Sequence, residues 1–449
     1  MKLYLDIATS YYTESLTLII GTGFSKWITN GKAPNWLELI VYCIDRIDPT
    51  LKDVFLVKDT GNGYISGDIP LTVVAQLLEI EAQKRNMILK DIACECIQSA
   101  TIDSNIDKDK VNLFKSMFED KKAINIITTN YDKIISEYIF QSSRIFTEGS
   151  VFSKVSSGID IFHIHGIVTN PSSLVLTQND YYNFQIKNNY FSRKLYTLIH
   201  ENSIGILGYS LNDSDINFIL NEANTQKMKN FHNGDIFYIT KNEINSKLKD
   251  FYKLSFDIEV LENTTFEDFI SKFNMQKHSA NNMLESFSNI DSILAGKGTF
   301  EDEYLKIRDS FYQIIKHISM NGLSLSDGHI YTILLAVLQK KKEFCREYGA
   351  WEQYDHLSDW LIELLSIVDI KDIPQEGIKE VIIFSLNTCS RNQIWGHSWY
   401  AYRNWEKKWK NLLYNNQLFL KEIIVHEFTD SDPGEIKLLL EQTHDPHHI

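Results

Sequence analysis

The chain has 449 residues, more than one ordinary domain needs, and 43% of them are hydrophobic, which is enough for two sizeable cores. Its formal net charge of −14 argues against a free-standing nucleic-acid-binding protein, which needs a basic face. Because no signal peptide or membrane-length apolar run is visible, and the five cysteines are scattered, we expect a cytoplasmic protein without disulfides or membrane contact.

The N-terminal stretch predicts a helix and then a strand that leads into a glycine-rich turn. The helix covers residues 1–15, and we expect Tyr11 and Tyr12 on its surface. The strand, Leu16–Ile20, runs directly into Gly21-Thr22-Gly23-Phe24-Ser25, a pattern typical of phosphate-binding loops. The third glycine of the dinucleotide fingerprint is missing, so a tight turn with positive φ explains these glycines equally well.

The stretch Ile124–Asp132 reads as a buried strand that ends abruptly in polar residues. Its first part is rich in isoleucine, which suits a strand of a covered parallel sheet. Asn130 and Asp132 follow just past the carboxyl end of this strand, where ligands bind in open α/β sheets. The alternative is that Asn130 only caps a helix over residues 131–140, since Asn is a preferred N-cap residue.

Two histidines lie in a second alternating stretch, Ile159–Ile167. His163 and His165 would face the same side of a strand, but no carboxylate or cysteine accompanies them at a ligand spacing, so we expect no metal site. His165 precedes a glycine and is the better candidate for proton transfer, because histidine titrates near neutrality. The alternative is a histidine bonded to the backbone. Cys94 and Cys96 lack a second cysteine pair and are expected in a helix core.

Further strands alternate with helices over the rest of the first half. We expect strands at residues 173–176, 203–207, 235–240 and 255–261, and helices at residues 36–47, 71–86, 87–102, 177–182, 215–224 and 265–273, with residues 50–120 mostly helical. The strand at residues 203–207 ends in Gly208-Tyr209-Ser210. This alternation predicts an α/β domain with a Rossmann-like parallel sheet and right-handed crossovers.

The second half predicts an all-α domain. A boundary at residues 275–300 separates residues 1–275 from residues 276–449, and helices are expected at residues 300–320, 327–347, 351–368 and 375–389. Trp395, Trp399, Tyr402, Trp405 and Trp409 approximate a helical stripe, which favours a core or a protein interface over a ligand site. The basic residues around this stripe suit a solvated face rather than nucleic-acid contact, and the histidine-rich tail, residues 444–448, suits a free terminus.

Four strand ends carry glycine or polar residues in a specific order: residues 21–25, residues 128–132, His165-Gly166 and residues 208–210. This ordered set resembles the sirtuin family and, more closely, the sirtuin-like NAD-consuming domains of prokaryotic anti-phage defence proteins, over roughly residues 10–275. The resemblance implies that Asn130 and His165 are catalytic. It also implies that NAD is bound by Gly21, Thr22, Gly23, Phe24, Ser25, Thr129, Asp132, Gly208 and Ser210, with residues 240–242 on the adenine side.

Two departures from deacylating sirtuins bear on the activity. The four cysteines of their structural zinc module are absent, and their Gly-Ile-Pro-Asp-Phe-Arg stretch is replaced by Gly-Lys-Ala-Pro-Asn-Trp at residues 31–36. Both argue against protein deacetylation. The resemblance therefore implies an NAD+ glycohydrolase that cleaves NAD+ to nicotinamide and ADP-ribose without a metal, and that depletes NAD during abortive infection.

Two alternatives stay open at the level of the sequence. A zinc-less deacylase or an ADP-ribosyl transferase would release nicotinamide only when an acceptor is present. A non-catalytic NAD or ADP-ribose sensor would bind nucleotide without turnover. The helical domain is expected to regulate the site, as a homo-oligomer interface or as a dock for a partner, which in similar systems is a HerA-type ATPase or a short Argonaute.

Overall fold

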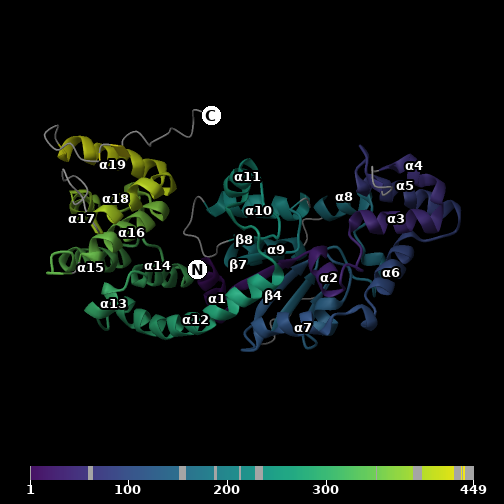
Figure 1. Ribbon diagram of the computed structural model, residues 1–449, viewed down its shortest axis with the longest axis horizontal. Coiled ribbons are helices and arrows are strands. Elements are labelled where there is room, and N and C mark those ends of the chain that lie inside the picture. Colours follow the sequence, from purple (N-terminus) through teal and green to yellow (C-terminus); the bar gives the residue numbers. More distant parts are fainter. Residues whose placement is uncertain are drawn as a thin grey trace. The chain divides into compact units, whose positions relative to one another are not determined.

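The computed structural model describes residues 2–58, 64–150, 158–186, 190–211, 214–227, 236–349, 351–387 and 397–428, together with Ile436, Leu438 and Leu439. The chain divides into two units, of which the first ends at Leu284 and the second begins at Glu285. Figure 1 shows a sheet with its covering helices in the first unit and a group of helices in the second. Among the described residues, no helix is long and apolar enough to cross a membrane.

A seven-stranded sheet lies at the centre of the first unit, in the order β5-β6-β4-β1-β7-β8-β9. The strands are β1 (Leu16–Ile20), β4 (Ile124–Thr128), β5 (Arg144–Phe146), β6 (Ile159–His163), β7 (Ser203–Leu207), β8 (Ile236–Ile239) and β9 (Ile258–Leu261). All neighbouring pairs run parallel. The expected Rossmann-like parallel sheet is therefore confirmed. The strand order reverses between β1 and β7, and such a reversal opens a crevice at the carboxyl ends of the strands.

Side chains alternate along each strand, so the sheet carries two separate cores. One core, which includes Ile126, lies under α1 (Lys2–Tyr12), α2 (Thr22–Ile28), α7 (Lys108–Lys115) and α12 (Phe266–Leu294). The other core, which includes Ile127, lies under α9 (Tyr190–Glu201), α10 (Ser214–Lys227) and α11 (Ser246–Phe256). Helix α2 follows β1 on one face and α10 follows β7 on the other, which is what a reversal of strand order requires.

The prediction that Tyr11 and Tyr12 lie on the surface is wrong. Both side chains are buried, and the ring of Tyr11 packs edge-on against Phe118 and Phe273. Their hydroxyl groups still find polar partners, because Tyr12 donates to Asp120 and Tyr11 accepts from the backbone N–H of Lys122. The helix α1 is thus anchored to the sheet by its aromatic face.

A third core belongs to a group of helices that we call the cap. The cap comprises α3 (Trp36–Ile47), α4 (Lys52–Phe55), α5 (Leu71–Lys84), α6 (Leu89–Ala100) and the antiparallel ribbon of β2 (Leu56–Lys58) and β3 (Tyr64–Ser66). Figure 1 shows α3, α5 and α6 together next to α8 (Gln178–Ile186). Cys94 and Cys96 lie in this core as expected, and burial raises the pKa of each thiol to about 11.

Two predicted elements of the first unit are wrong. Residues 173–176 form no strand: a 3-10 turn over Pro171–Ser173 leads into an extended segment. Its backbone N–H groups donate elsewhere, that of Val175 to the carbonyl of His165 and that of Leu176 to the carboxylate of Asp180. The helix expected over residues 131–140 is a single π-helical turn, Ile135–Ile139. The ribbon β2–β3, β5 and α11 were not predicted.

The second unit is helical, as the sequence predicts. Its helices are α13 (Asp302–Lys306), α14 (Ser310–Met320), α15 (Gly328–Phe344), α16 (Glu352–Ile367), α17 (Gln375–Asn387), α18 (His397–Lys408) and α19 (Tyr414–Glu427). Tyr402, Trp405 and Trp409 are buried, so these three members of the aromatic stripe belong to the core, while Trp399 is 39% exposed. Trp395 and the histidine-rich tail lie outside the described residues.

Candidate functional site

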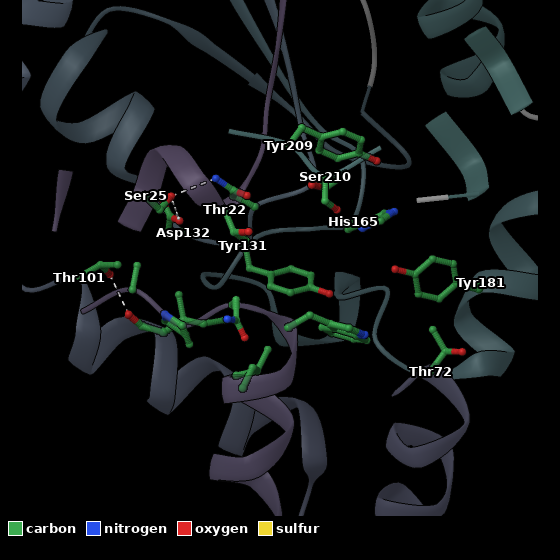
Figure 2. Close-up of a pocket in the computed structure, with 18 of the residues that line it drawn as sticks. Thr22, Ser25, Thr72, Thr101, Tyr131, Asp132, His165, Tyr181, Tyr209 and Ser210 are labelled. Carbon is green, nitrogen blue, oxygen red and sulfur yellow. Dashed lines mark hydrogen bonds between the residues drawn. The ribbon is translucent and has the colours of Figure 1, made fainter. Parts of the chain in front are cut away.

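A pocket of about 380 Å³ lies in the first unit, where the carboxyl ends of β1, β4, β6 and β7 meet the cap and α8. Its described lining residues are Thr22, Ser25, Ala33, Pro34, Asn35, Trp36, Leu39, Thr72, Ile97, Thr101, Thr129, Asn130, Tyr131, Asp132, His165, Gln178, Tyr181, Tyr182, Tyr209 and Ser210. In the view of Figure 2, Ser25 and Asp132 lie on one side of the pocket and His165 and Tyr181 on the other, with Tyr131 between them. This volume suits a small-molecule site.

The glycines at the reversal of strand order pack against one another. The N–H of Gly23 donates to the carbonyl of Gly208 over 2.8 Å. A Cβ atom at Gly21 would lie 2.6 Å from that same carbonyl oxygen, and Gly208 has a φ of +61°. Each glycine is therefore required by the close approach of the other loop. None of the three lines the pocket, whereas their neighbours Thr22 and Ser210 do.

Phe24 is buried completely and packs edge-on against Phe114, so its side chain belongs to the core beneath α2. Ser25 follows it on α2, and its side chain reaches the residues that follow β4. The hydroxyl of Ser25 donates to Oδ2 of Asp132 over 2.6 Å and accepts from Nδ2 of Asn130 over 2.9 Å (Figure 2). These three side chains form one hydrogen-bonded chain inside the pocket wall.

The Ser25 hydroxyl fixes the orientation of the Asn130 amide. A hydroxyl group has one proton, and that proton is given to the carboxylate of Asp132. Ser25 can then only accept from Asn130, so Nδ2 faces Ser25 and the carbonyl Oδ1 faces away. Oδ1 is buried and has no hydrogen-bond partner among the described residues. An unpaired buried acceptor costs about 1–3 kcal/mol, which marks it as a position that a ligand can satisfy.

The expectation that Asn130 caps a helix is not met by the geometry. Its side chain bonds Ser25, and the next helical turn begins only at Ile135. The local turn is instead closed by Asp132, whose Oδ1 accepts from the N–H of Ile134 over 3.0 Å. Burial raises the pKa of Asp132, and its hydrogen bonds with Ser25 and Ile134 oppose that shift. Among the described lining residues, Asp132 is the one carboxylate, and no lysine or arginine is present.

The two histidines occupy different places. His165 lies beyond the end of β6, is 2% exposed and lines the pocket, where its ring meets Tyr181 edge-on at 5.3 Å. His163 ends β6 and does not line the pocket; its Nδ1 lies 3.0 Å from the backbone oxygen of Asn130. Burial lowers the pKa of His163 to about 4. Among the described residues, no group of three potential metal ligands is found.

Comparison with known proteins shows what this part of the chain resembles. Residues 124–261 match the model of the SIR2-like domain. This part of the chain is similar to the SIR2-like domain. NAD(+) hydrolase ThsA of Bacillus cereus (strain MSX-D12) is 22% identical over 237 residues, and defense-associated sirtuin 2 of Bacillus subtilis is 27% identical over 114 residues. These alignments cover 50% and 24% of this chain, but only 49% and 11% of the two relatives. The resemblance to sirtuin-like domains is thereby confirmed.

The matched residues of the SIR2-like domain contain most of the expected site. Thr129, Asn130, Asp132, His165 and Ser210 fall within the match and line the pocket. The segment with Thr22 and Ser25 precedes the match, but β1 pairs with both β4 and β7, which brings this segment to the same edge of the sheet. Residues 240–242, expected on the adenine side, follow β8 and do not line this pocket.

The SIR2-like domain also receives pocket residues that the sequence did not indicate. Leu39, Thr72, Ile97 and Thr101 come from the cap and its edge, and Gln178, Tyr181 and Tyr182 come from α8. The hydroxyl of Thr72 donates to the side chain of Gln178, which joins the cap to α8 at the edge of the pocket. Tyr131 also lines the pocket, and its position between Asn130 and Asp132 in the sequence could have indicated this. Its hydroxyl donates to the carbonyl of Val175.

Proposed function

We propose that the chain is an NAD+ glycohydrolase that cleaves NAD+ to nicotinamide and ADP-ribose. The observation that carries the proposal is the buried, unpartnered Oδ1 of Asn130 in a pocket that also contains Asp132 and His165. The SIR2-like domain and the relative named as an NAD(+) hydrolase support the same chemistry. In this reaction Oδ1 of Asn130 would accept a hydrogen bond, His165 would accept a proton and Asp132 would face the developing positive charge.

The bond to be broken joins C1′ of the ribose to a nicotinamide nitrogen that is already positively charged. Its cleavage sends the bonding electron pair to nicotinamide, which leaves as a neutral molecule without an acid. Positive charge then develops on the ribose, as in other glycoside hydrolyses. Asp132 supplies the one negative charge among the described lining residues, and in a buried site a fixed charge stabilises the developing cation strongly. The aromatic lining suits a flat pyridinium ring.

Water completes the reaction. The Oδ1 atom of Asn130 would accept a hydrogen bond from the attacking water or from a ribose hydroxyl and so orient the nucleophile. The water oxygen forms a bond to C1′, and its proton passes to the imidazole of His165, directly or through that hydroxyl. His165 is held for this role by burial and by the ring of Tyr181. The products are nicotinamide and ADP-ribose.

The biological role follows from the relatives rather than from the site. We propose that NAD depletion by this chain serves anti-phage defence, because one relative is named as a defense-associated sirtuin. The second unit would then regulate the site, as an oligomer interface or as a dock for a partner such as a HerA-type ATPase or a short Argonaute. Measurement of the mass by light scattering, with and without a candidate partner, tests this part separately.

The decisive experiment follows nicotinamide and ADP-ribose released from NAD+ by the purified chain, beside Asn130→Ala and His165→Ala. We expect turnover in the wild type and a loss of about 100- to 10,000-fold in each variant, the range for orienting and proton-transfer groups. Trp399→Ala, an exposed residue of the second unit, is the control that should keep the wild-type rate. Binding of NAD+ without turnover would favour the sensor, and nicotinamide release only with an acylated peptide would favour the deacylase.

A further inference from the structure

His163 is a buried histidine that touches the site from behind without lining it. It is 1% exposed, and its Nδ1 lies 3.0 Å from the backbone oxygen of Asn130. Since a carbonyl oxygen only accepts, the proton must be on Nδ1, and the ring donates to Asn130. His163 Nε2 is buried and has no hydrogen-bond partner among the described residues. The ring is therefore held in one tautomer by a single contact, and that contact leads to Asn130.

The backbone of His163 also reaches the turn that carries His165. Its carbonyl accepts from the N–H of Gly166 over 3.3 Å, and the next N–H, of Ile164, donates to the carbonyl of Thr128 over 3.0 Å. In the sheet His163 stands opposite Thr128, two residues before Asn130. One residue thus bonds the loop of Asn130 through its side chain and the turn of His165 through its backbone.

We propose that His163 is a positioning residue, whose Nδ1–H holds the backbone of Asn130 so that the Asn130 amide meets Ser25 and presents Oδ1 to the substrate. This inference rests on the proposed function. Among the described residues, the side chain of Asn130 makes one hydrogen bond, from Nδ2 to Ser25, so a shift of its backbone moves the amide directly. A displacement of a catalytic group by about 1 Å costs on the order of 100-fold in rate.

The low pKa of His163 keeps its ring neutral near pH 7, so its hydrogen bond to Asn130 does not change with pH in that range. Desolvation lowers the pKa of His163 to about 4, and the hydrogen bond to Asn130 opposes that shift. Thr128 stands opposite His163 on the neighbouring strand, and the backbone oxygen of Asn130 accepts from its ring, and neither residue carries a charge. His163 accordingly stays neutral, with its proton on Nδ1, throughout the pH range of the reaction, and the contact does not titrate together with the substrate chemistry.

The test compares His163→Asn with His163→Leu. The Nδ2 of asparagine can replace the Nδ1–H donor, whereas leucine fills similar space without a donor. We expect His163→Leu to lower kcat for nicotinamide release by about 10- to 100-fold with KM changed less than about twofold, and His163→Asn to recover most of the loss. His329→Leu is the control, because His329 also contacts a backbone carbonyl, that of Leu294, but through Nε2 and at an exposed position far along the chain from the pocket residues. It should leave kcat unchanged.

Crystal structures of the two variants test the positioning role of His163 whether or not the protein is active. In His163→Leu, Nδ2 of Asn130 should leave Ser25, and in His163→Asn it should stay. An Asn130–Ser25 bond that survives in His163→Leu overturns the proposal, as do equal losses of kcat in both variants. Failure of the proposed function looks different, since the wild type itself would then release no nicotinamide. Nitrogen-15 spectra of the wild type that show the His163 proton on Nε2 would also contradict the positioning role of His163.

Discussion

The carboxylate of Asp132 decides which atom of the Asn130 amide meets Ser25 and which is left without a partner. While Asp132 is ionised, it takes the Ser25 proton, and Asn130 presents Oδ1. Once Asp132 is protonated or replaced by asparagine, Ser25 can donate to Oδ1 of Asn130 instead, and the amide would then turn its NH2 group toward the substrate. A change of one charge thus reverses the direction of two hydrogen bonds and replaces the free acceptor of Asn130 with a donor.

Asp132→Asn should therefore lower activity strongly without lowering stability. Burial raises the pKa of Asp132, so the folded chain holds this proton more tightly than the unfolded chain, and stability falls as pH rises through that window. The asparagine of the variant has no proton to lose, so the variant does not lose this stability as pH rises. We expect kcat to fall by about 100- to 1,000-fold, while the melting temperature at pH 7.5 is equal to or above that of the wild type, with a smaller advantage at pH 4.5.

Asp180→Asn is the control, because the pKa of Asp180 is shifted in the opposite direction from that of Asp132. Asp180 does not line the pocket, and it accepts from the N–H groups of Leu176 and Thr177 and pairs with Lys90. Its pKa is lowered in spite of desolvation, because these bonds favour the charged form. Asp180→Asn should lower the melting temperature at pH 7.5. Wild-type turnover by Asp132→Asn would contradict the role assigned to Asp132.

At the residue scale, the sequence predicted the pocket residues that follow strands and missed those that do not. Thr22, Ser25, Thr129, Asn130, Asp132, His165 and Ser210 were proposed from four strand ends and from the sirtuin resemblance that these carry, and the structure brings all of them to one pocket. Thr72 and Thr101 lie on or just after cap helices with no such signal. Phe24 was assigned with its glycine neighbours, although its ring belongs to the core.

At the scale of elements, strands were predictable where their own residues carried the signal. The strands β1 and β7 match their predicted bounds, because each is a mostly apolar run that follows a polar residue and ends at a glycine. The strands β2, β3 and β5 have three residues each, too few to show an alternating hydrophobic pattern. They form because they pair with a neighbouring strand. Leu174–Leu176 is apolar and extended but forms no ladder, because Asp180 accepts the N–H groups of Leu176 and Thr177.

Lys341 on α15 is an ionisable group buried within the helical unit. Its Nζ donates to the carbonyl of Leu305 at the end of α13 and lies over the ring of Trp360 at 4.1 Å. Desolvation lowers the pKa of Lys341 from its ordinary value near 10.5 to about 7. The groups around it include Cys345 on the same helix, Glu352 and His356 on α16, and Arg308.

The burial of Lys341 predicts a pH-dependent stability. Between pH 7 and about 10 the unfolded chain binds this proton and the folded chain does not, so the native state gains stability as pH rises. The difference in unfolding free energy between wild type and Lys341→Met should shift in favour of the wild type by about 1.4 kcal/mol for each pH unit in that window. Urea unfolding at pH 6, 7, 8 and 9 measures it.

Lys340→Met is the matched control, since Lys340 is the preceding residue but is 39% exposed at its side chain and pairs with Asp302. Its difference from the wild type should stay constant over the same pH range. A constant difference for Lys341→Met as well would mean that Lys341 keeps an ordinary pKa in the folded chain.

At the scale of the whole molecule, α12 decides where the first unit can be cut. The sequence places a boundary at residues 275–300, with the division after residue 275, and α12 runs through most of this range to Leu294. Ala280 is buried in the core of the first unit, and Lys277 pairs with Asp120 and donates to the carbonyl of Ser116. A fragment of residues 1–294 should therefore unfold at a higher temperature than a fragment of residues 1–275, in which these contacts are lost.

The longer fragment also separates catalysis from regulation. An unregulated NAD+ glycohydrolase would harm the cell that makes it, so we expect the second unit to restrain the pocket or to await a partner. All described pocket residues lie between Thr22 and Ser210, so residues 1–294 retain the complete site. If the second unit restrains the site, this fragment should release nicotinamide faster than the full chain, and Asn130→Ala should abolish that gain. A fragment that binds NAD+ but turns over more slowly than the full chain would show instead that the helical unit is needed to assemble the active state.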